Sequence, residues 1–103
     1  MNKDIKDAHK NNRVGPIFRT GELAMAAIDA MEEDNPDKEF TIEDRTAYIR
    51  VETDHECVIR RKTMEEMLGR AFEMQELEVV LASFSGQIEA EQEYMRFYFA
   101  TKM

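Results

Sequence analysis

Few residues in this sequence have the types and spacing that catalysis or metal binding needs. The run Glu52-Thr53-Asp54-His55 spells Glu-x-x-His, a pattern that supplies ligands in di-iron proteins. Such sites need the pattern twice, on helices, with further glutamates facing it. Here it occurs once, at a predicted hairpin turn, and the other histidine, His9, lies in a polar N-terminal segment. We therefore expect no metal site.

Nucleophiles and phosphate-binding loops are equally sparse. Cys57 is the only cysteine, and its place in a predicted strand favours a packed thiol over a reactive one. The sequence contains no glycine-rich phosphate loop, nucleophile elbow or Walker pattern. Carboxylates are plentiful, but none has the apolar setting that raises a pKa for acid catalysis. We predict a protein that is not an enzyme and has no cofactor.

Composition excludes several classes of protein. A chain of 103 residues with 43% hydrophobic residues is long enough for one domain with one modest core. The net charge of −8 argues against nucleic acid as a ligand, since phosphate binding needs a basic face. No apolar run approaches the 18 or so residues of a membrane span, and residues 1–12 lack the apolar core of a signal peptide. A single cysteine fits a reducing compartment, so we expect a cytoplasmic protein.

Periodicity places the elements that would position a binding surface. Residues 1–12 are polar and carry both signs of charge, so we expect a flexible arm followed by one domain over 13–103. The first strand is expected at 13–19, where Pro16 has no N–H and requires either a sheet edge or a bulge.

A helix is expected next, with Thr20 as its N-cap. Its apolar stripe is rich in alanine and comprises Leu23, Ala24, Ala27, Ile28, Ala30 and Met31. It ends in the acidic residues 32–34, which oppose the helix macrodipole, and Asn35-Pro36 stops it. Acidic residues that cost helix stability hint at use by a partner, with simple solvation as the alternative.

The middle of the chain predicts three strands and a second helix. The strands are expected at 40–42, 47–52 and 57–59. After a short basic run, Thr63-Met64-Glu65-Glu66 has the form of a capping box that starts a helix. Gly69 suits the left-handed residue that closes it.

The last third predicts further strands. The alternation of Leu77, Val79 and Leu81 indicates a half-buried strand, and the turn at 73–76 is too brief for a stable helix on its own. A hairpin is expected to pair 87–90 with 94–99, with Met95, Phe97 and Phe99 in the core. The order is β-α-β-β-β-α-β-β, an α+β domain with mostly antiparallel sheet and two main helices.

The stretch around Phe84 interrupts this regularity. Ser83, Ser85 and Gly86 are small residues where a strand would normally continue or end in a recognisable turn. One interpretation is a bulge between two core strands with a buried Phe84. The other is a shaped loop that another protein contacts.

Taken together, these segments resemble the small effector, or coupling, proteins of bacterial multicomponent di-iron monooxygenases, most closely those of the toluene monooxygenase branch. The similarity is carried by NNRVGPIFRTGEL, EDNP, EDRTAYIRV, RKTMEEMLGR, FEMQELEVVLASFSGQI and RFYF, in this order from Asn11 to Phe99. The chain departs from the family pattern at Ala71, where proline is usual, and at Glu73 and Val80, where asparagine is usual. These departures leave open which hydroxylase it serves.

The resemblance implies a protein without metal or cofactor that binds a separate multi-subunit di-iron hydroxylase. It would reshape the hydroxylase active site and tune oxygen activation, coupling and regiospecificity in aromatic hydrocarbon catabolism. It also suggests competition with the electron-donating ferredoxin for the same hydroxylase surface. The residues expected to contact the hydroxylase are Asn11, Asn12, Asn35, Met74, Gln75, Ser83, Phe84, Ser85 and Gln87.

An alternative function from a different class is an acidic inhibitor that mimics nucleic acid. The carboxylates at 32–39 and 89–93 could line one surface for that purpose. The two functions predict different partners. An effector would bind a multi-subunit oxygenase, whereas a nucleic-acid mimic would bind a nuclease or a repressor.

Overall fold

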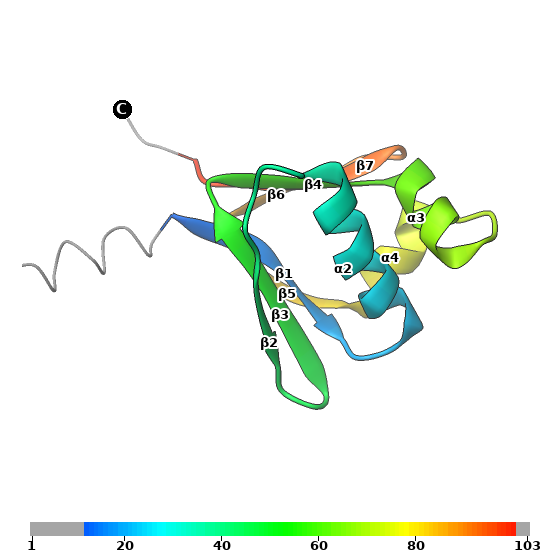
Figure 1. The fold of residues 1–103 in the computed structure, drawn as a ribbon, viewed down its shortest axis with the longest axis horizontal. Helices are drawn as coiled ribbons and strands as arrows, with labels where there is room; N and C mark the ends of the chain where they lie inside the picture. The colour runs from blue at the N-terminus through cyan, green and yellow to red at the C-terminus, as the bar shows by residue number, and fades with distance from the viewer. Residues whose placement is uncertain (1–11, 101–103) are drawn as a thin grey trace, which may run out of the picture.

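Two antiparallel sheets and three helices share one core. The computed structural model describes residues 12–100, and the elements below are those of that part of the chain. In chain order they are β1 (Arg13–Arg19), α2 (Glu22–Asp34), β2 (Thr41–Asp44), β3 (Tyr48–Asp54), β4 (Glu56–Arg60), α3 (Arg61–Leu68), α4 (Met74–Val80), β5 (Leu81–Ser85), β6 (Gln87–Ala90) and β7 (Tyr94–Tyr98) (Figure 1). The predicted α+β class with antiparallel sheet is confirmed, and the structure adds one helix and one strand to the predicted order.

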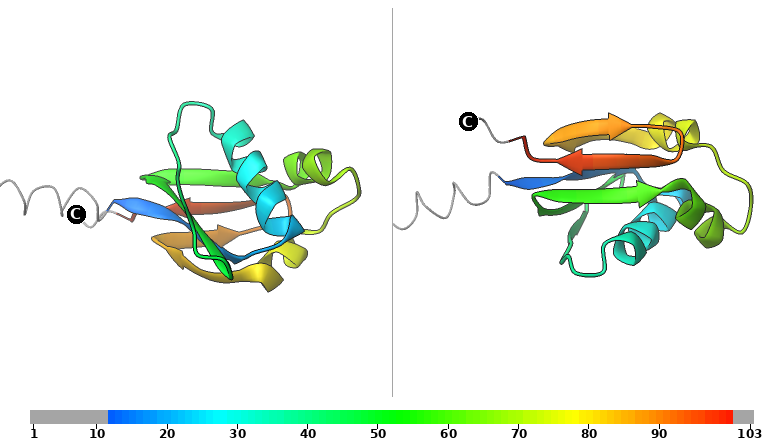
Figure 2. Two further views of the ribbon diagram at one scale, coloured as in Figure 1. Left: turned by 60° about the horizontal axis from the view of Figure 1, so that its bottom comes forward. Right: turned by 90° about the horizontal axis from the view of Figure 1, so that it is seen from above.

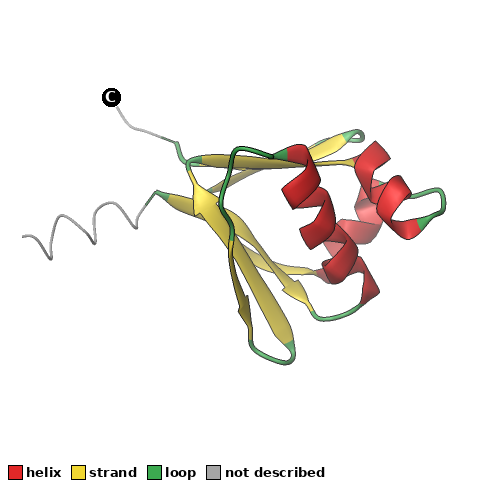
Figure 3. Ribbon diagram, in the orientation of Figure 1, coloured by secondary structure: helices red, strands yellow, loops and turns green. Residues whose placement is uncertain are grey.

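The strands form a four-stranded sheet in the order β2-β3-β1-β5 and a three-stranded sheet in the order β4-β7-β6. Consecutive strands β5 and β6 therefore belong to different sheets, and each is a free edge. The helices gather toward one end of the molecule (Figure 3). Strand β1 begins and strand β7 ends at the opposite end (Figure 2).

The core lies between the inner faces of the two sheets and helix α2. As predicted, the alanine-rich stripe of α2 is buried, and it includes Ala24, Ala27, Ile28, Ala30 and Met31. Small side chains let this helix pack closely on β4 and α3. Met95 and Phe97 are fully buried, as predicted from their alternation in β7, and Phe99 packs partly against them.

Strand β1 resolves the alternatives that Pro16 left open. It is not a sheet edge, because it lies between β3 and β5. Its pairing with β5 instead shifts register between Ile17 and Phe18, which is a bulge. The predicted edge position is therefore wrong, and a register irregularity follows Pro16 in the pairing with β5.

Two predicted helix starts were wrong. Helix α2 is preceded by Gly21 as its N-cap, and the Thr20 hydroxyl instead donates to the carbonyl of Thr46 at 2.7 Å. Helix α3 begins at Arg61, so Thr63 lies inside it, and its hydroxyl donates to Asp34 Oδ1 at 2.7 Å. The left-handed Gly69 that closes α3 is as predicted, with φ 72°.

Asp34 explains one of the acidic residues at the end of α2. Its side chain is only 6% exposed, and its Oδ2 accepts the backbone N–H of Arg60 at 2.9 Å. The carboxylate thus caps the start of α3, where a negative charge is favourable. This carboxylate has a structural role within the chain.

The strand predicted over 77–81 was also wrong. Residues 74–80 form helix α4, and Leu81 is the first residue of β5. A true capping box lies here, with the Glu73 side chain bound to the N3 backbone and the Glu76 side chain bound to the Glu73 N–H at 3.1 Å. Burial of Met74 and Leu77 holds this short helix in place, and Val79 is left 73% exposed.

Candidate functional site

Within residues 12–100 no group of three or more histidine, cysteine or acidic side chains is placed to hold a metal ion. Cys57 is 1% exposed, and burial raises the pKa of its thiol to about 12. The packed cysteine predicted from the sequence is confirmed. No helix in this part of the chain is long and apolar enough to cross a membrane.

The run predicted to contact a partner begins at α4. The helix is fastened at its start by Arg70, whose guanidinium donates to Glu76 at 3.1 and 3.4 Å. This hydrogen bond, more than the accompanying charge attraction, lowers the pKa of the Glu76 carboxyl. Met74 is buried at 3% exposure, whereas Gln75 is exposed. Of these two predicted contact residues, only Gln75 presents its side chain at the surface.

Gly86 is the corner at which the chain leaves one sheet for the other. Its φ is +88°, and a Cβ there would lie 2.7 Å from the Tyr98 carbonyl oxygen and 2.6 Å from Val14 Cγ1. Only glycine fits this close approach between β1 and β7. The irregularity noted at 83–86 is therefore a passage between two edge strands, β5 and β6.

The side chains of β5 alternate between two faces. Phe84 pairs with Pro16, and its ring packs inward on Phe97. Phe84 nevertheless remains 38% exposed. Ser83 and Ser85 project on the opposite, outer face, where they pair with Ile17 and Gly15. The stretch is a strand with a register irregularity and not a loop, and Phe84 is only partly buried. Contact of this stretch with another protein stays a prediction.

A polar network on the outer face ends at Ser85. The Ser85 hydroxyl donates to Glu52 Oε2 at 3.0 Å, and the same oxygen accepts from Arg50 at 3.0 Å. Arg50 also lies 3.6 Å from Glu43 on the far edge strand β2. Gly15 pairs with Ser85, and a Cβ there would clash with the backbone of Val51 and Glu52, so only glycine allows β1 and β3 to approach closely beside this network. Ser85 is thus held in position and partly exposed.

The outer face of the three-stranded sheet adjoins this edge. Gln87 is exposed there and pairs with Tyr98. On the neighbouring positions, the Tyr94 hydroxyl donates to Glu89 at 2.8 Å, and Arg96 donates to the other oxygen of Glu89 at 2.8 Å. These two bonds, that of Tyr94 first, lower the pKa of the Glu89 carboxyl.

The predicted asparagines lie apart from this run. Asn35 is 9% exposed, and its amide donates to the carbonyls of Met31 and Val58 and accepts from the Val58 N–H. Its polar atoms are used inside the chain, and the structure gives it a role in the fold. Asn12 is partly exposed and its carbonyl accepts the His55 N–H at 3.0 Å. Asn11 lies outside the described residues.

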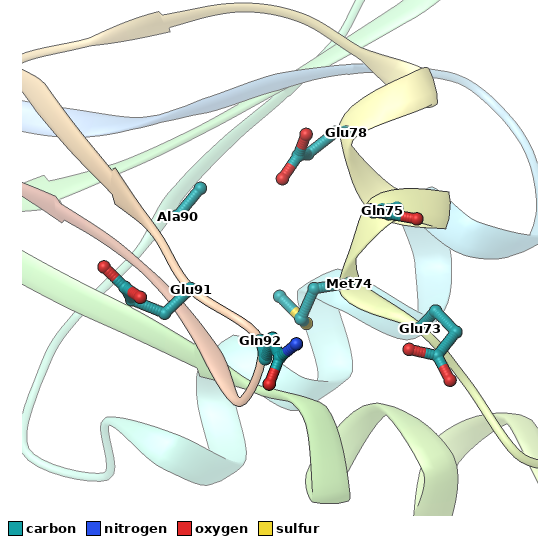
Figure 4. Close-up of a pocket in the computed structure, with 7 residues that line it drawn as sticks. All are labelled: Glu73, Met74, Gln75, Glu78, Ala90, Glu91 and Gln92. Carbon is teal, nitrogen blue, oxygen red and sulfur yellow. The ribbon is translucent and has the colours of Figure 1, made fainter.

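A cleft of about 280 Å³ separates α4 from the β6–β7 turn (Figure 4). Its lining is Glu73, Met74, Gln75, Glu78, Ala90, Glu91 and Gln92. Glu78 on α4 and Glu91 on the turn approach it from opposite sides. Sequence reasoning did not select Glu78, because residues 77–81 were assigned to a strand and not to a helix facing the hairpin. The contact between Glu52 and Ser85 could not be predicted from a local sequence pattern, since 33 positions separate the two residues.

Comparison with known proteins places the chain among monooxygenase components. The model of the MmoB/DmpM family matches residues 12–98. The chain is 38% identical to the effector subunit of the alkene monooxygenase system of Xanthobacter autotrophicus, over 96% of this chain and 98% of that protein. It is 33% identical to the stimulatory component DmpM of phenol 2-monooxygenase from Pseudomonas sp., over 70% of this chain and 78% of that protein.

Solved structures show the same fold. A chain of a phenol hydroxylase–regulatory protein complex superposes with a TM-score of 0.72 at 30% identity, covering 85% of this chain and 99% of that chain. The soluble methane monooxygenase regulatory protein B superposes with a TM-score of 0.65 at 16% identity, covering 86% of this chain and 66% of that chain. The second likeness shows the fold alone.

Proposed function

The chain belongs to the MmoB/DmpM family and is an effector component of a multicomponent monooxygenase, and on that premise we propose that it binds a multi-subunit di-iron hydroxylase through the edge formed by β5 and the start of β6. The family relatives are named as effector and stimulatory components, so this chain is a non-catalytic part of the system. Its effect on turnover must then arise from what it does to the hydroxylase when bound.

One observation carries the choice of surface. Strand β5, with the sequence LASFS, is a sheet edge without a charged residue in a chain of net charge −8. The other edge strands, β2, β4 and β6, each carry at least one glutamate. Charged residues on exposed edge strands normally prevent pairing with other chains. An edge strand without charged residues is therefore a candidate surface for contact with a partner.

Four of the predicted contact residues lie at or beside this edge. Ser83 and Ser85 lie on one side of it, and Gln87 continues onto the neighbouring sheet. Gln75 is exposed on the helix that leads into β5. Small side chains at Ser83 and Ser85 allow a partner to approach the backbone closely. A specific interface buries about 800 Å² on each partner, and the surroundings of β5 would supply part of that area.

The anchored geometry of β5 explains how contact could be transmitted. The Ser85 hydroxyl donates to Glu52 and the Phe84 ring packs on Phe97, so side chains on both faces of the edge strand have partners within the domain. A preformed edge loses little conformational entropy on binding, and more of the binding energy remains available to change the hydroxylase. The tuning of oxygen activation, coupling and regiospecificity is the expected outcome of that change.

Reconstituted turnover tests this function. Hydroxylase, reductase and ferredoxin of an alkene, phenol or toluene system are combined with increasing amounts of the purified chain, and product and oxygen consumption are measured. The chain alone should form no product, and with its cognate hydroxylase it should give saturable stimulation close to one chain per active site. Absence of binding and stimulation with all three classes of hydroxylase would contradict the proposal.

Three finer assignments rest on the same proposal. Competition with the ferredoxin predicts that an excess of this protein inhibits turnover once stimulation has saturated. The reason is that this protein and the ferredoxin would occupy the same hydroxylase surface. The toluene branch is a prediction that substrate profiling of the cognate hydroxylase decides, since the relatives named above serve alkene and phenol systems. A cytoplasmic location accords with a buried, reduced Cys57.

A further inference from the structure

Hydrogen bonds beyond the two ends of β1 establish which way its backbone groups point. The His55 N–H donates to the carbonyl of Asn12, and the Thr20 N–H donates to the carbonyl of Ala47, both at 3.0 Å. Both bonds lie on the β3 side of β1, in the same register as the ladder between these strands. Backbone groups alternate sides along an antiparallel strand, so even-numbered residues of β1 face β3 and odd-numbered residues face β5.

The alternation exposes the backbone of Phe84. Pro16 is even-numbered and faces β3, yet it is the residue that stands opposite Phe84 in β5. The pair is therefore of the kind without hydrogen bonds, and the N–H and C=O of Phe84 point away from β1 toward the free edge. The neighbouring pairs, Ile17 with Ser83 and Gly15 with Ser85, are those that exchange hydrogen bonds.

The edge of β6 is open in the same way. The Glu91 N–H donates to the Tyr94 carbonyl at 2.8 Å, which places the odd-numbered residues of β6 against β7. The backbone groups of Ile88 and Ala90 then point away from β7. The two free edges diverge from the Gly86 corner, and the cleft between α4 and the β6–β7 turn lies at the wide end (Figure 4).

The charges at the wide end indicate what could lie there. Glu78 and Glu91 are exposed, and neither takes part in an ion pair or side-chain hydrogen bond with any residue in the described part of the chain. No lysine or arginine lines the cleft. A positively charged side chain from outside would find two free carboxylates there.

We propose that the free edge of β5 takes an extended segment of the hydroxylase as an added strand, with a lysine or arginine of that segment in the cleft beside Glu78 and Glu91. This inference rests on the proposed function and specifies the form of the contact. Pairing at Phe84 supplies backbone hydrogen bonds, and the distance from Phe84 to the start of β5 is about three residues, or about 10 Å, at the rise of a strand. The cleft lies just beyond that point.

A second copy of the chain is a poorer occupant. Pairing β5 with β5 of another copy would bring two chains of charge −8 together and place like carboxylates near one another. A basic segment of a different protein meets the opposite charge. Sedimentation of the free protein as a stable dimer, abolished by substitution at β5, would overturn the choice of occupant.

A matched pair of substitutions tests the backbone contact. Phe84→Ala and Phe84→Pro both remove the ring that packs on Phe97, but only proline also removes the outward N–H. Both are compared with the parent for hydroxylase binding after circular dichroism has confirmed folding. We expect Phe84→Pro to bind at least tenfold more weakly than Phe84→Ala. Equal binding by the two folded variants would overturn the added strand.

Hydrogen exchange tests the same contact without a substitution. The isotope-labelled chain is exchanged alone or bound to hydroxylase, and amide signals are read by nuclear magnetic resonance after release. The Phe84 amide should exchange quickly in the free chain and at least tenfold more slowly in the complex. Its neighbours at 83 and 85, already bonded to β1, should be protected in both. Unchanged exchange at Phe84 in a formed complex would contradict the proposal, and absence of any complex would overturn the proposed function and this inference with it.

Charge reversal tests the occupant of the cleft. The double variant Glu78→Lys with Glu91→Lys should weaken hydroxylase binding at least tenfold at low salt, and by less as salt rises. The control is Glu32→Lys with Glu33→Lys, which changes the net charge equally on exposed residues of α2. Equal losses in both variants would indicate general steering by the net charge and would refute a basic residue in the cleft.

Discussion

The ring of Phe84 on β5 lies against the ring of Phe97 on β7, with centroids 6.0 Å apart and planes inclined by 49°. The two residues belong to different sheets, and one is 38% exposed while the other is fully buried. The contact joins the free edge of the four-stranded sheet to the centre of the core. A partner that touches β5 therefore touches a strand that is tied to the most buried part of the domain.

Loss of the Phe97 ring should be among the most damaging single changes. Phe97→Ala is expected to lower the free energy of unfolding by about 3–5 kcal/mol, because it removes buried apolar surface and leaves a cavity. Urea denaturation measures this value. Tyr48→Ala, at a residue 46% exposed on β3, serves as the control and should change it by about 0.5 kcal/mol or less. A loss below about 1 kcal/mol for Phe97→Ala would mean that its burial contributes little.

The Cys57 thiol should be chemically silent in the folded chain. Its pKa is raised to about 12 by burial, so almost no thiolate is present at pH 8. Labelling with a disulfide reagent should be slow for the native protein and fast in denaturant. The thiol of the unfolded chain ionises near its ordinary pKa of 9.0, whereas the buried thiol stays protonated. The free energy of unfolding therefore falls as the pH rises from about 9 to 12. Rapid labelling of the native protein would contradict the packing described for β4.

Glu89 should make stability depend on pH in the acid range. Its pKa is lowered by the hydrogen bonds from Tyr94 and Arg96. The stabilisation is fully present above the ordinary pKa of 4.5 and is lost as the pH falls through the lower folded value. Glu89→Gln should therefore flatten the decline of melting temperature below pH 4.5, and Glu91→Gln should leave it nearly unchanged. Identical profiles for the Glu89→Gln variant and the parent would refute the assignment.

Much of the core could be predicted from local patterns, since the alternation in β7 and the apolar stripe of α2 indicate burial directly. Helix α4 could not be predicted in this way. Leu77, Val79 and Leu81 have the spacing of a strand, yet the chain buries Met74 and Leu77 at helical spacing and exposes Val79. Seven residues are too few for a helix to be stable alone, so its packing on the core decides the outcome. That packing involves residues distant in sequence and is not visible in a short window.

The start of α3 shows the same limit. Thr63 has the local form of a capping residue, but the carboxylate that binds the first turn is Asp34, which is 29 residues away from Thr63. A separation of 23 residues likewise hid the role of Asn35, whose amide joins α2 to Val58 in β4. Around Phe84 the small residues indicated an interruption of the regular strand, but not that β5 is a sheet edge, because strand order depends on pairing with the distant β1. The contact of this stretch with a hydroxylase stays a prediction.

Asp34 should be worth more to stability than its acidic neighbours. Asp34→Ala removes the acceptor for the Arg60 N–H and the Thr63 hydroxyl, and we expect a loss of about 1–3 kcal/mol by urea denaturation. Glu33→Ala, an exposed residue one position earlier, should cost about 0.5 kcal/mol or less. Equal effects of the two substitutions would show that Asp34 does not cap α3.

Binding of Ser85→Trp to the hydroxylase is the most direct test of the contact surface. Ser85 is partly exposed on the outer face of β5, and its only side-chain partner in the described part of the chain is the Glu52 carboxylate at the surface, so an indole that displaces this contact should leave circular dichroism and melting temperature nearly unchanged. We expect hydroxylase affinity to fall at least tenfold, about 1.4 kcal/mol, through steric exclusion. Ala47→Trp, in the exposed turn before β3, is the control and should bind like the parent. If Ser85→Trp binds and stimulates the hydroxylase as well as the parent does, the edge of β5 is not the contact surface.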